Sequence, residues 1–188
     1  MSDPQWIEQV ISIDRVARVV KGGRRFRFRA LVAVGDGKRQ VGVGVAKGAD
    51  VQSAITKAIM VAKKQLIKVE LQAGTIPHEV SVKHGGAHVM LKPAAAGTGV
   101  IAGGVIRTVI DATGIENILS KSLGSNSKVN NAYATIAALR SLVPRQDWVT
   151  TINAPAKAKT AKKPSASPAK TRPARPSAKA KTSAGVKK

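Results

Sequence analysis

Residues 19–32, VVKGGRRFRFRALV, alternate apolar and charged side chains with the period of two that is typical of a β-strand. Four apolar residues share one face of this strand: Phe26, Phe28, Ala30 and Val32. Three arginines share the other face, about 6.6 Å apart, until Leu31 ends the row: Arg25, Arg27 and Arg29. Because Lys21-Gly22-Gly23 supplies a flexible turn just before them, the run predicts a β-hairpin with one apolar and one basic face.

The segments on either side of this hairpin extend the pattern into a first domain. Three strand-like runs are separated by glycine-containing turns: residues 8–20, 24–34 and 40–46. A helix follows, because Asp50 suits the N-cap position and apolar residues recur at helical spacing from Val51 to Leu66. Lys57 and Lys64 fall away from its apolar stripe. Residues 1–72 are therefore predicted to form a three-stranded antiparallel sheet plus a helix.

A second strand and helix pattern occupies residues 73–152. Strands are expected at 78–84 and 87–92, a helix at 104–113, a strand-like run at 117–123 and a last helix at 128–142. The apolar side of the last helix is expected to hold Val129, Tyr133, Ile136 and Leu139. The fold class is thus α+β, with two small α/β-layered domains, the second a sheet with two helices. Domains this small are expected to pack against each other.

The composition changes near Asn153. Residues 153–188 consist mainly of Ala, Lys, Pro, Ser and Thr, with eleven Lys or Arg and no acidic or aromatic residue. Such a segment lacks the apolar surface needed to offset the entropy of ordering. We therefore expect a disordered basic tail after the second domain.

The net charge of the chain restricts its possible functions more than any other property of the sequence. The chain has 32 Lys or Arg against 10 Asp or Glu, a net charge of +22, and the part before the tail is itself strongly basic. This excess opposes compaction unless a polyanion neutralises it, so the composition favours a polyanionic partner: nucleic acid, an anionic membrane surface or an acidic protein. The chain has no cysteine, no apolar run long enough to span a bilayer and no signal-peptide pattern at MSDPQWIEQ. We expect a cytoplasmic protein without a membrane partner.

The arginine face is the best candidate contact with that polyanion. Guanidinium groups match phosphate oxygens, and glycines let the backbone approach a ligand closely. A solvated edge strand is the simpler alternative. Phe26 and Phe28 are too few for an aromatic RNA-recognition sheet, so we assign both to the core and expect recognition of backbone and shape.

Other motifs argue against catalysis and cofactors. Gly97 to Gly104 fits neither the dinucleotide nor the P-loop spacing, and close backbone packing is the preferred interpretation, as it is for Gly42, Gly44 and Gly48. The three histidines, His78, His84 and His88, lack a convincing fourth zinc ligand. The acidic residues are scattered. We predict no catalytic residue, metal, cofactor or small-molecule substrate; a nucleotide-dependent enzyme is the remotest alternative.

Two long runs and one short one carry a family resemblance: KGGRRFRFRALVAVGDGKRQVGVGVAKGADVQSAITKA (21–58), KPAAAGTGVIAGGVIRTVIDATGIENILSKSLGS (92–125) and NNAYATIAAL in the last helix. Over residues 8–145 the chain resembles the family of bacterial small-subunit ribosomal protein S-five. The resemblance implies an N-terminal domain similar to a double-stranded-RNA-binding fold. It also implies contact with small-subunit ribosomal RNA, a role in steadying the subunit's head against its body and in translational accuracy, and proteins S-four and S-eight as neighbours.

The resemblance also implies roles for particular residues. The hairpin loop of the family reaches ribosomal RNA near the site of spectinomycin action, and the residues at matching positions are Arg18, Lys21, Gly22, Gly23 and Arg24. The region that faces protein S-four in the family matches Gly97, Gly99, Gly103, Gly104 and Arg107. The 153–188 tail departs from the usual family length; it would add non-specific RNA affinity or act as a spacer.

The sequence therefore predicts a ribosome-bound structural protein of the small subunit. Its candidate RNA-binding residues are Arg18, Lys21, Gly22, Gly23, Arg24, Arg25, Arg27, Arg29, Lys57 and Lys64. The alternative is a nucleoid or chromatin-like DNA-binding protein that acts through its basic tail.

Overall fold

The computed structural model describes residues 5–145 and Trp148. The tail predicted at 153–188 lies outside the described residues. The described residues belong to one compact unit. None of the described helices is long and apolar enough to cross a membrane.

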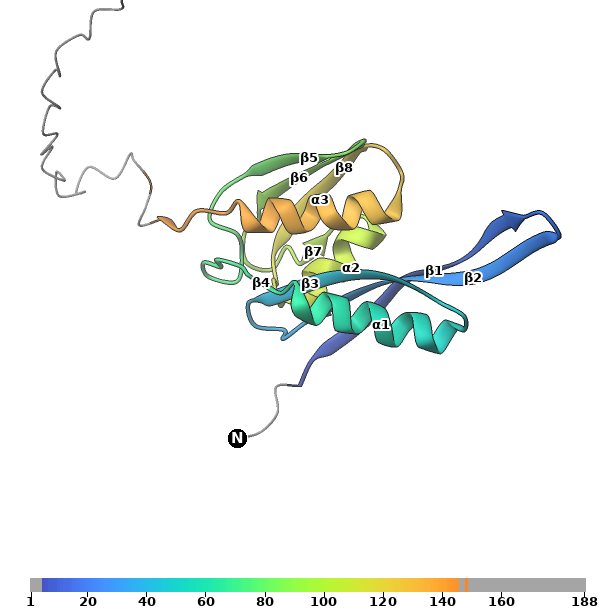
Figure 1. Cartoon of the computed structure of the whole chain (residues 1–188). Helices are drawn as coiled ribbons and strands as arrows, with labels where there is room; N and C mark the ends of the chain where they lie inside the picture. Colours follow the sequence, from blue (N-terminus) through green and yellow to red (C-terminus); the bar gives the residue numbers. More distant parts are fainter. Residues whose placement is uncertain (1–4, 146–147, 149–188) are drawn as a thin grey trace, which may run out of the picture. The chain divides into compact units, whose positions relative to one another are not determined.

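The N-terminal sheet is an antiparallel meander followed by a helix (Figure 1). Its strands are β1 (Ile7–Val20), β2 (Gly23–Gly35), β3 (Gln40–Gly48) and β4 (Ile67–Lys68), in the order β1-β2-β3-β4. The predicted meander is confirmed, but the predicted number of three strands is wrong. The fourth strand pairs Lys68 with Gln40 and Ile67 with Val41, and two residues are too few to show an alternating pattern.

Helix α1 (Val51–Lys64) begins where the sequence predicts. The backbone N–H of Asp50 donates to Ser53 Oγ over 3.2 Å, which satisfies one polar group at the start of the helix. The buried face of α1 consists of alanines: Ala54, Ala58 and Ala62. These small residues pack against glycines of β3, because a Cβ at Gly44 would overlap the carbonyl oxygen of Ala58. The close-packing interpretation is confirmed for this glycine.

The turn between β2 and β3 is held by one carboxylate. Asp36 Oδ1 accepts the backbone N–H groups of Lys38, Arg39 and Gln40, each over 2.8 Å. Burial by itself would raise the pKa of Asp36, but the hydrogen bonds from these N–H groups outweigh it and hold that pKa below its usual value. The tight turn predicted at Gly35-Asp36-Gly37-Lys38 therefore depends on the ionised form of Asp36.

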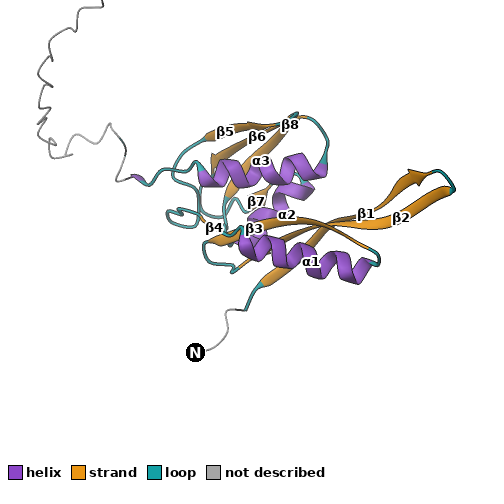
Figure 2. Cartoon of the chain, in the orientation of Figure 1, coloured by secondary structure: helices purple, strands orange, loops and turns teal. Residues whose placement is uncertain are grey.

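The second domain is a mixed sheet with two helices (Figure 2). Its strands are β5 (Val80–His84), β6 (Ala87–Pro93), β7 (Val100–Ile101) and β8 (Ile118–Gly124), in the order β5-β6-β8-β7. Only the short β7 runs parallel to its neighbour, β8. The helices are α2 (Gly104–Thr113) and α3 (Lys128–Arg140). The predicted fold class, two α/β domains of which the second has two helices, is confirmed.

Helix α3 buries a different face from the predicted one. Of the four residues expected on its apolar side, only Leu139 is fully buried, and Val129, Tyr133 and Ile136 are half-buried. The buried face is made mostly of small or polar side chains: Asn131, Ala132, Ala134, Thr135 and Ala138. Thr135 satisfies its hydroxyl by donating to the Asn131 carbonyl over 2.8 Å. Small residues let the helix approach the sheet closely, so their burial outweighs the pull of the larger side chains.

The first sheet is buried on both faces in the central part of β2, from Ala30 to Val34. Ala30, Val32 and Val34 of β2 pack with the alanines of α1. Leu31 and Ala33, which point the other way, join a core with Ile106 and Ile110 of α2. Because that core also contains side chains of the second sheet, the two domains share one apolar interior. The predicted mutual packing is confirmed, and the ranges 1–72 and 73–152 stay predictions.

Candidate nucleic-acid interface

The β1–β2 hairpin is longer than the sheet to which it belongs. Strand β3 pairs with β2 only as far as the Phe28–Gly48 pair, so residues 16–27 form a ribbon of two strands that projects from the body (Figure 1). The five residue steps from Phe28 to Gly23 extend it by about 17 Å. We call residues 16–27 the hairpin extension. At its tip Gly23 has a φ of +138°, which favours glycine over other residues.

The hairpin extension exposes its charge. Residues 15–29 hold seven Lys or Arg and no Asp or Glu. The predicted contact residues at and near its tip are all exposed: Arg18, Lys21, Gly22, Gly23, Arg24, Arg25 and Arg27. Neither Gly22 nor Gly23 has any atom within 4 Å of the place a Cβ would occupy, so a ligand can approach their backbone.

One face of the extension forms a basic groove. The strand register sets Arg18 opposite Arg25, Val16 opposite Arg27 and, on the next strand, Lys47 opposite Arg29. A hollow of about 490 Å³ lies there, and its basic lining residues are Arg18, Arg25, Arg27 and Lys47. We call these four residues the basic groove. Sequence reasoning missed Lys47, because its position opposite Arg29 depends on strand register, which no local pattern in the sequence reveals.

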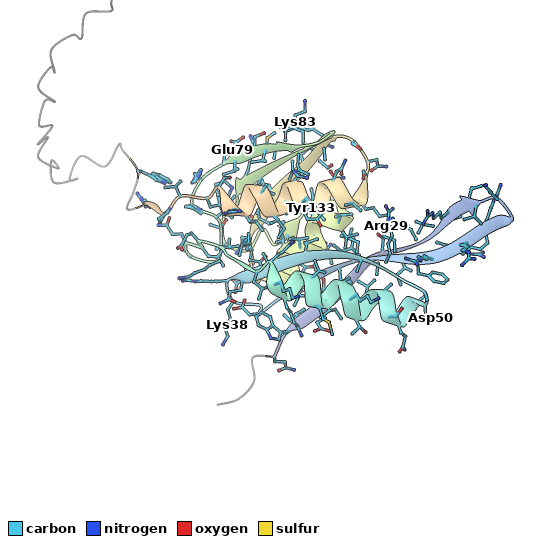
Figure 3. The ribbon with its side chains drawn as sticks, viewed as in Figure 1. Arg29, Lys38, Asp50, Glu79, Lys83 and Tyr133 are labelled. Carbon is cyan, nitrogen blue, oxygen red and sulfur yellow. The ribbon has the colours of Figure 1, made fainter. Side chains whose placement is uncertain are left out.

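Arg29 lies at the base of the extension and already has a partner (Figure 3). Its Nη2 and Nε atoms donate to Asp14 Oδ2 over 2.8 and 3.2 Å, and both side chains stay more than one-third exposed. The carboxylate offsets part of the charge that Arg29 would offer to a phosphate. Its assignment as an RNA contact stays a prediction.

The assignment of Phe26 to the core is wrong. Its side chain is 48% exposed, because Phe26 lies beyond the part of β2 that packs with α1. The guanidinium carbon of Arg15 lies 3.8 Å from the centre of the Phe26 ring, a cation–π contact. Phe28, two residues nearer the body, is half-buried against the cluster of α1 as predicted.

The two predicted lysines of α1 are not part of the basic groove. Lys57 and Lys64 are exposed. Helix α1 packs on the face of β2 that holds Ala30 and Val32, whereas the arginines of the groove alternate to the opposite face. The structure therefore separates the predicted basic residues into two surfaces.

The glycine-rich segment that leads to α2 lies at the surface. Gly97 and Gly99 have φ angles of +90° and +74°, and both backbone N–H groups donate to Asn117 Oδ1 over 3.0 Å. The predicted close packing is wrong here, because a Cβ at Gly97, Gly99, Gly103 or Gly104 would meet no atom within 4 Å. Left-handed turns explain the first two glycines. The fold itself does not require glycine at the other two.

Arg107, the last residue of this predicted contact region, is exposed on α2. Its Nε lies 3.8 Å from Asp111 Oδ2, one turn further along the helix. Within residues 5–145 and Trp148, no three His, Cys, Asp or Glu side chains come together as a metal site.

The fold and the site define a class: small, strongly basic α+β proteins whose arginine-lined hairpin suits a polyanion. Two family models match, ribosomal protein S5, N-terminal domain, at residues 6–70 and ribosomal protein S5, C-terminal domain, at residues 82–149. The chain belongs to the ribosomal protein S5 family. It is similar to small ribosomal subunit protein uS5 of Acaryochloris marina (strain MBIC 11017), with 51% identity over 141 residues, 74% of this chain and 80% of that protein.

Proposed function

We propose that this protein is a structural component of the small ribosomal subunit and that it binds small-subunit ribosomal RNA through the hairpin extension. Membership of the ribosomal protein S5 family and the similarity to a small-subunit protein support the first part. The observation that carries the second is the hairpin extension itself: residues 16–27 hold five basic residues and no acid, and none of them belongs to either apolar cluster.

The geometry gives each part of the extension a separate task. The basic groove binds the phosphates of an RNA backbone, because its guanidinium groups offer forked donors and its described lining residues include no carboxylate. The tip, Lys21 to Arg24, approaches the RNA most closely, since its glycines carry no side chain. Lys57 and Lys64 contact a different RNA segment, on the α1 side of the sheet. Most of these contacts are to phosphate and set position rather than sequence.

The exposed glycines and Arg107 in the segment from Gly97 to Arg107 support a contact with another ribosomal protein. Gly103 and Gly104 adjoin the exposed Ile101 (55%) and leave backbone open to a partner. We assign this surface to protein S-four and name protein S-eight as a second neighbour. Through these contacts the protein steadies the head of the subunit against its body and supports accurate decoding in the cytoplasm.

The family assignment gives no support to a nucleoid or chromatin-like DNA-binding protein. That alternative depends on the 153–188 tail, which lies outside the described residues. The proposal is structural and includes no catalytic residue, cofactor or small-molecule substrate.

Sedimentation of a cell extract tests the proposal. The full chain, tracked across a sucrose gradient at moderate salt, is expected to migrate with the small subunit. Purified protein should also prefer a small-subunit RNA fragment to duplex DNA of equal length at the same salt concentration. Migration away from the subunit, or equal affinity for the two nucleic acids, would contradict the proposal.

A further inference from the structure

A second hollow lies well away from the hairpin extension in sequence. It is about 710 Å³ in volume and is lined by residues of the α1–β4 connection, β3, β5 and α3. This volume falls within the range of about 300–1,000 Å³ that is typical of sites for small ligands. We call it the α3 groove. It combines flat rings, an apolar wall and basic side chains at its edge.

Two rings lie together in the α3 groove. Tyr133 projects from α3 (Figure 3), and its ring centre is 5.7 Å from that of His84 on β5, with an angle of 42° between the planes. Tyr133 is half-buried and His84 is exposed, so a ligand can reach both side chains. Ile67 and Ile136, which pack against the shared core, line the groove beside them. A planar, partly apolar ligand can stack there.

The charged side chains of the α3 groove are all basic. Lys68 on β4 and Arg140 at the end of α3 line it, and both are exposed. No Asp or Glu is among its described lining residues, and none of the four ion pairs of the described chain includes either residue. The groove therefore complements a ligand that joins a flat ring to an anionic group.

We propose that the α3 groove binds an unpaired nucleotide of RNA. The base stacks on Tyr133 and His84, while Lys68 and Arg140 bind the adjoining phosphates. Unpaired nucleotides are the part of structured RNA whose bases can leave the stack and pack on aromatic side chains. An acidic peptide would match the charge but not the pair of rings. The inference extends the proposed function, on which it rests, from phosphate contacts to a base contact at a second site.

A pair of RNA probes separates this site from the hairpin. One probe is a plain duplex of about 20 base pairs, and the other is the same duplex with a bulge of three uridines. Binding of the full chain is measured by fluorescence anisotropy at one salt concentration. The bulged RNA is expected to bind more tightly, because only it offers an unstacked base. One stacked base corresponds to about 5- to 160-fold in affinity.

The matched variants are Tyr133→Leu and Tyr133→Phe. Tyr133→Leu should lose the preference for the bulged RNA and keep its affinity for the plain duplex, while Tyr133→Phe keeps both, because the ring remains. Arg140→Gln should lower the salt dependence for the bulged probe by about 0.7 in log–log slope. Circular dichroism and thermal unfolding of each variant confirm that the fold is retained.

Crosslinking supplies an independent measurement. When the complex is irradiated, a 4-thiouridine in the bulge should crosslink to Tyr133 or His84. Because Tyr133 is the only tyrosine of the chain, a peptide crosslinked at tyrosine identifies the site. Three results would overturn the inference. The wild-type protein could bind the two probes with equal affinity, or Tyr133→Leu could lose as much affinity for the plain duplex as for the bulged RNA. An acidic peptide could also displace the bulged RNA where oligouridine does not. If neither RNA binds, the proposed function itself fails.

Discussion

The basic groove predicts a measurable change in salt dependence. Replacing Arg18, Arg25 and Arg27 with Gln removes three guanidinium groups that take part in none of the ion pairs among the described residues. Each phosphate contact contributes about 0.9 to the slope of log affinity against log salt for a duplex. The triple variant should therefore lose about 2.7 from that slope. Between 50 and 200 mM salt, the wild-type affinity should fall about 40-fold more than that of the variant.

The assay is filter binding of the full chain to a small-subunit RNA fragment at several salt concentrations. The variant should unfold at the wild-type temperature, because all three side chains are exposed and lie outside the two apolar clusters. A matched pair of single variants refines the test. Arg27→Gln should lower the slope by about 0.9. Arg29→Gln should lower it by less, because Asp14 already offsets the charge of Arg29.

An unchanged slope in the triple variant, with RNA still bound and the fold intact, would refute the assignment of the basic groove. If Arg27→Gln and Arg29→Gln lower the slope equally, the ion pair between Arg29 and Asp14 does not weaken the contact of Arg29 with RNA, and that part of the prediction is refuted.

Three further predictions concern single positions. Asp14→Asn should strengthen RNA binding at low salt, because it removes the carboxylate that pairs with Arg29. Gly44→Ala should destabilise the protein by about 1–3 kcal/mol in denaturant unfolding, since the added methyl overlaps the α1 backbone; Gly104→Ala, with open space around it, should be neutral or stabilising by up to about 1 kcal/mol. Because the pKa of Asp36 is lower in the folded than in the unfolded chain, its stabilising effect is present above pH about 4 and is lost as the pH falls further. Asp36→Asn should make the free energy of unfolding depend less on pH below about 4. The same pH dependence in the variant as in the wild type would contradict this.

The sequence predicted those parts of the fold that local pattern controls. The alternation of apolar and polar residues predicted β1, β2 and β3. The N-cap residue Asp50 and the helical spacing of apolar residues predicted the start of α1. Helix α2 also begins and ends where predicted. The patterns failed where distant parts of the chain decide burial. Phe26 belongs to the apolar face of β2, yet it is exposed because α1 does not reach that far. On α3, the close approach of the sheet favours small side chains over the larger residues Val129 and Ile136.

The candidate site was predictable in part, for a similar reason. The arginine row and the glycine turn are neighbours in sequence, so one strand pattern reveals them. The recruitment of Lys47 and the pairing of Arg29 with Asp14 depend on strand register, which only the folded sheet fixes. The α3 groove joins residues from 43 to 140 and has no local signature in the sequence.

The burial of the first sheet on both faces has a consequence for synthesis of the chain. Leu31 and Ala33 of β2 can be covered only after α2, about 70 residues later, has left the translating ribosome. At a translation rate of about 5–20 residues per second, this apolar face of β2 stays exposed to solvent for several seconds. We expect the nascent N-terminal half to need a chaperone or an early RNA contact during that interval. The shared core should form only late in the synthesis of the chain.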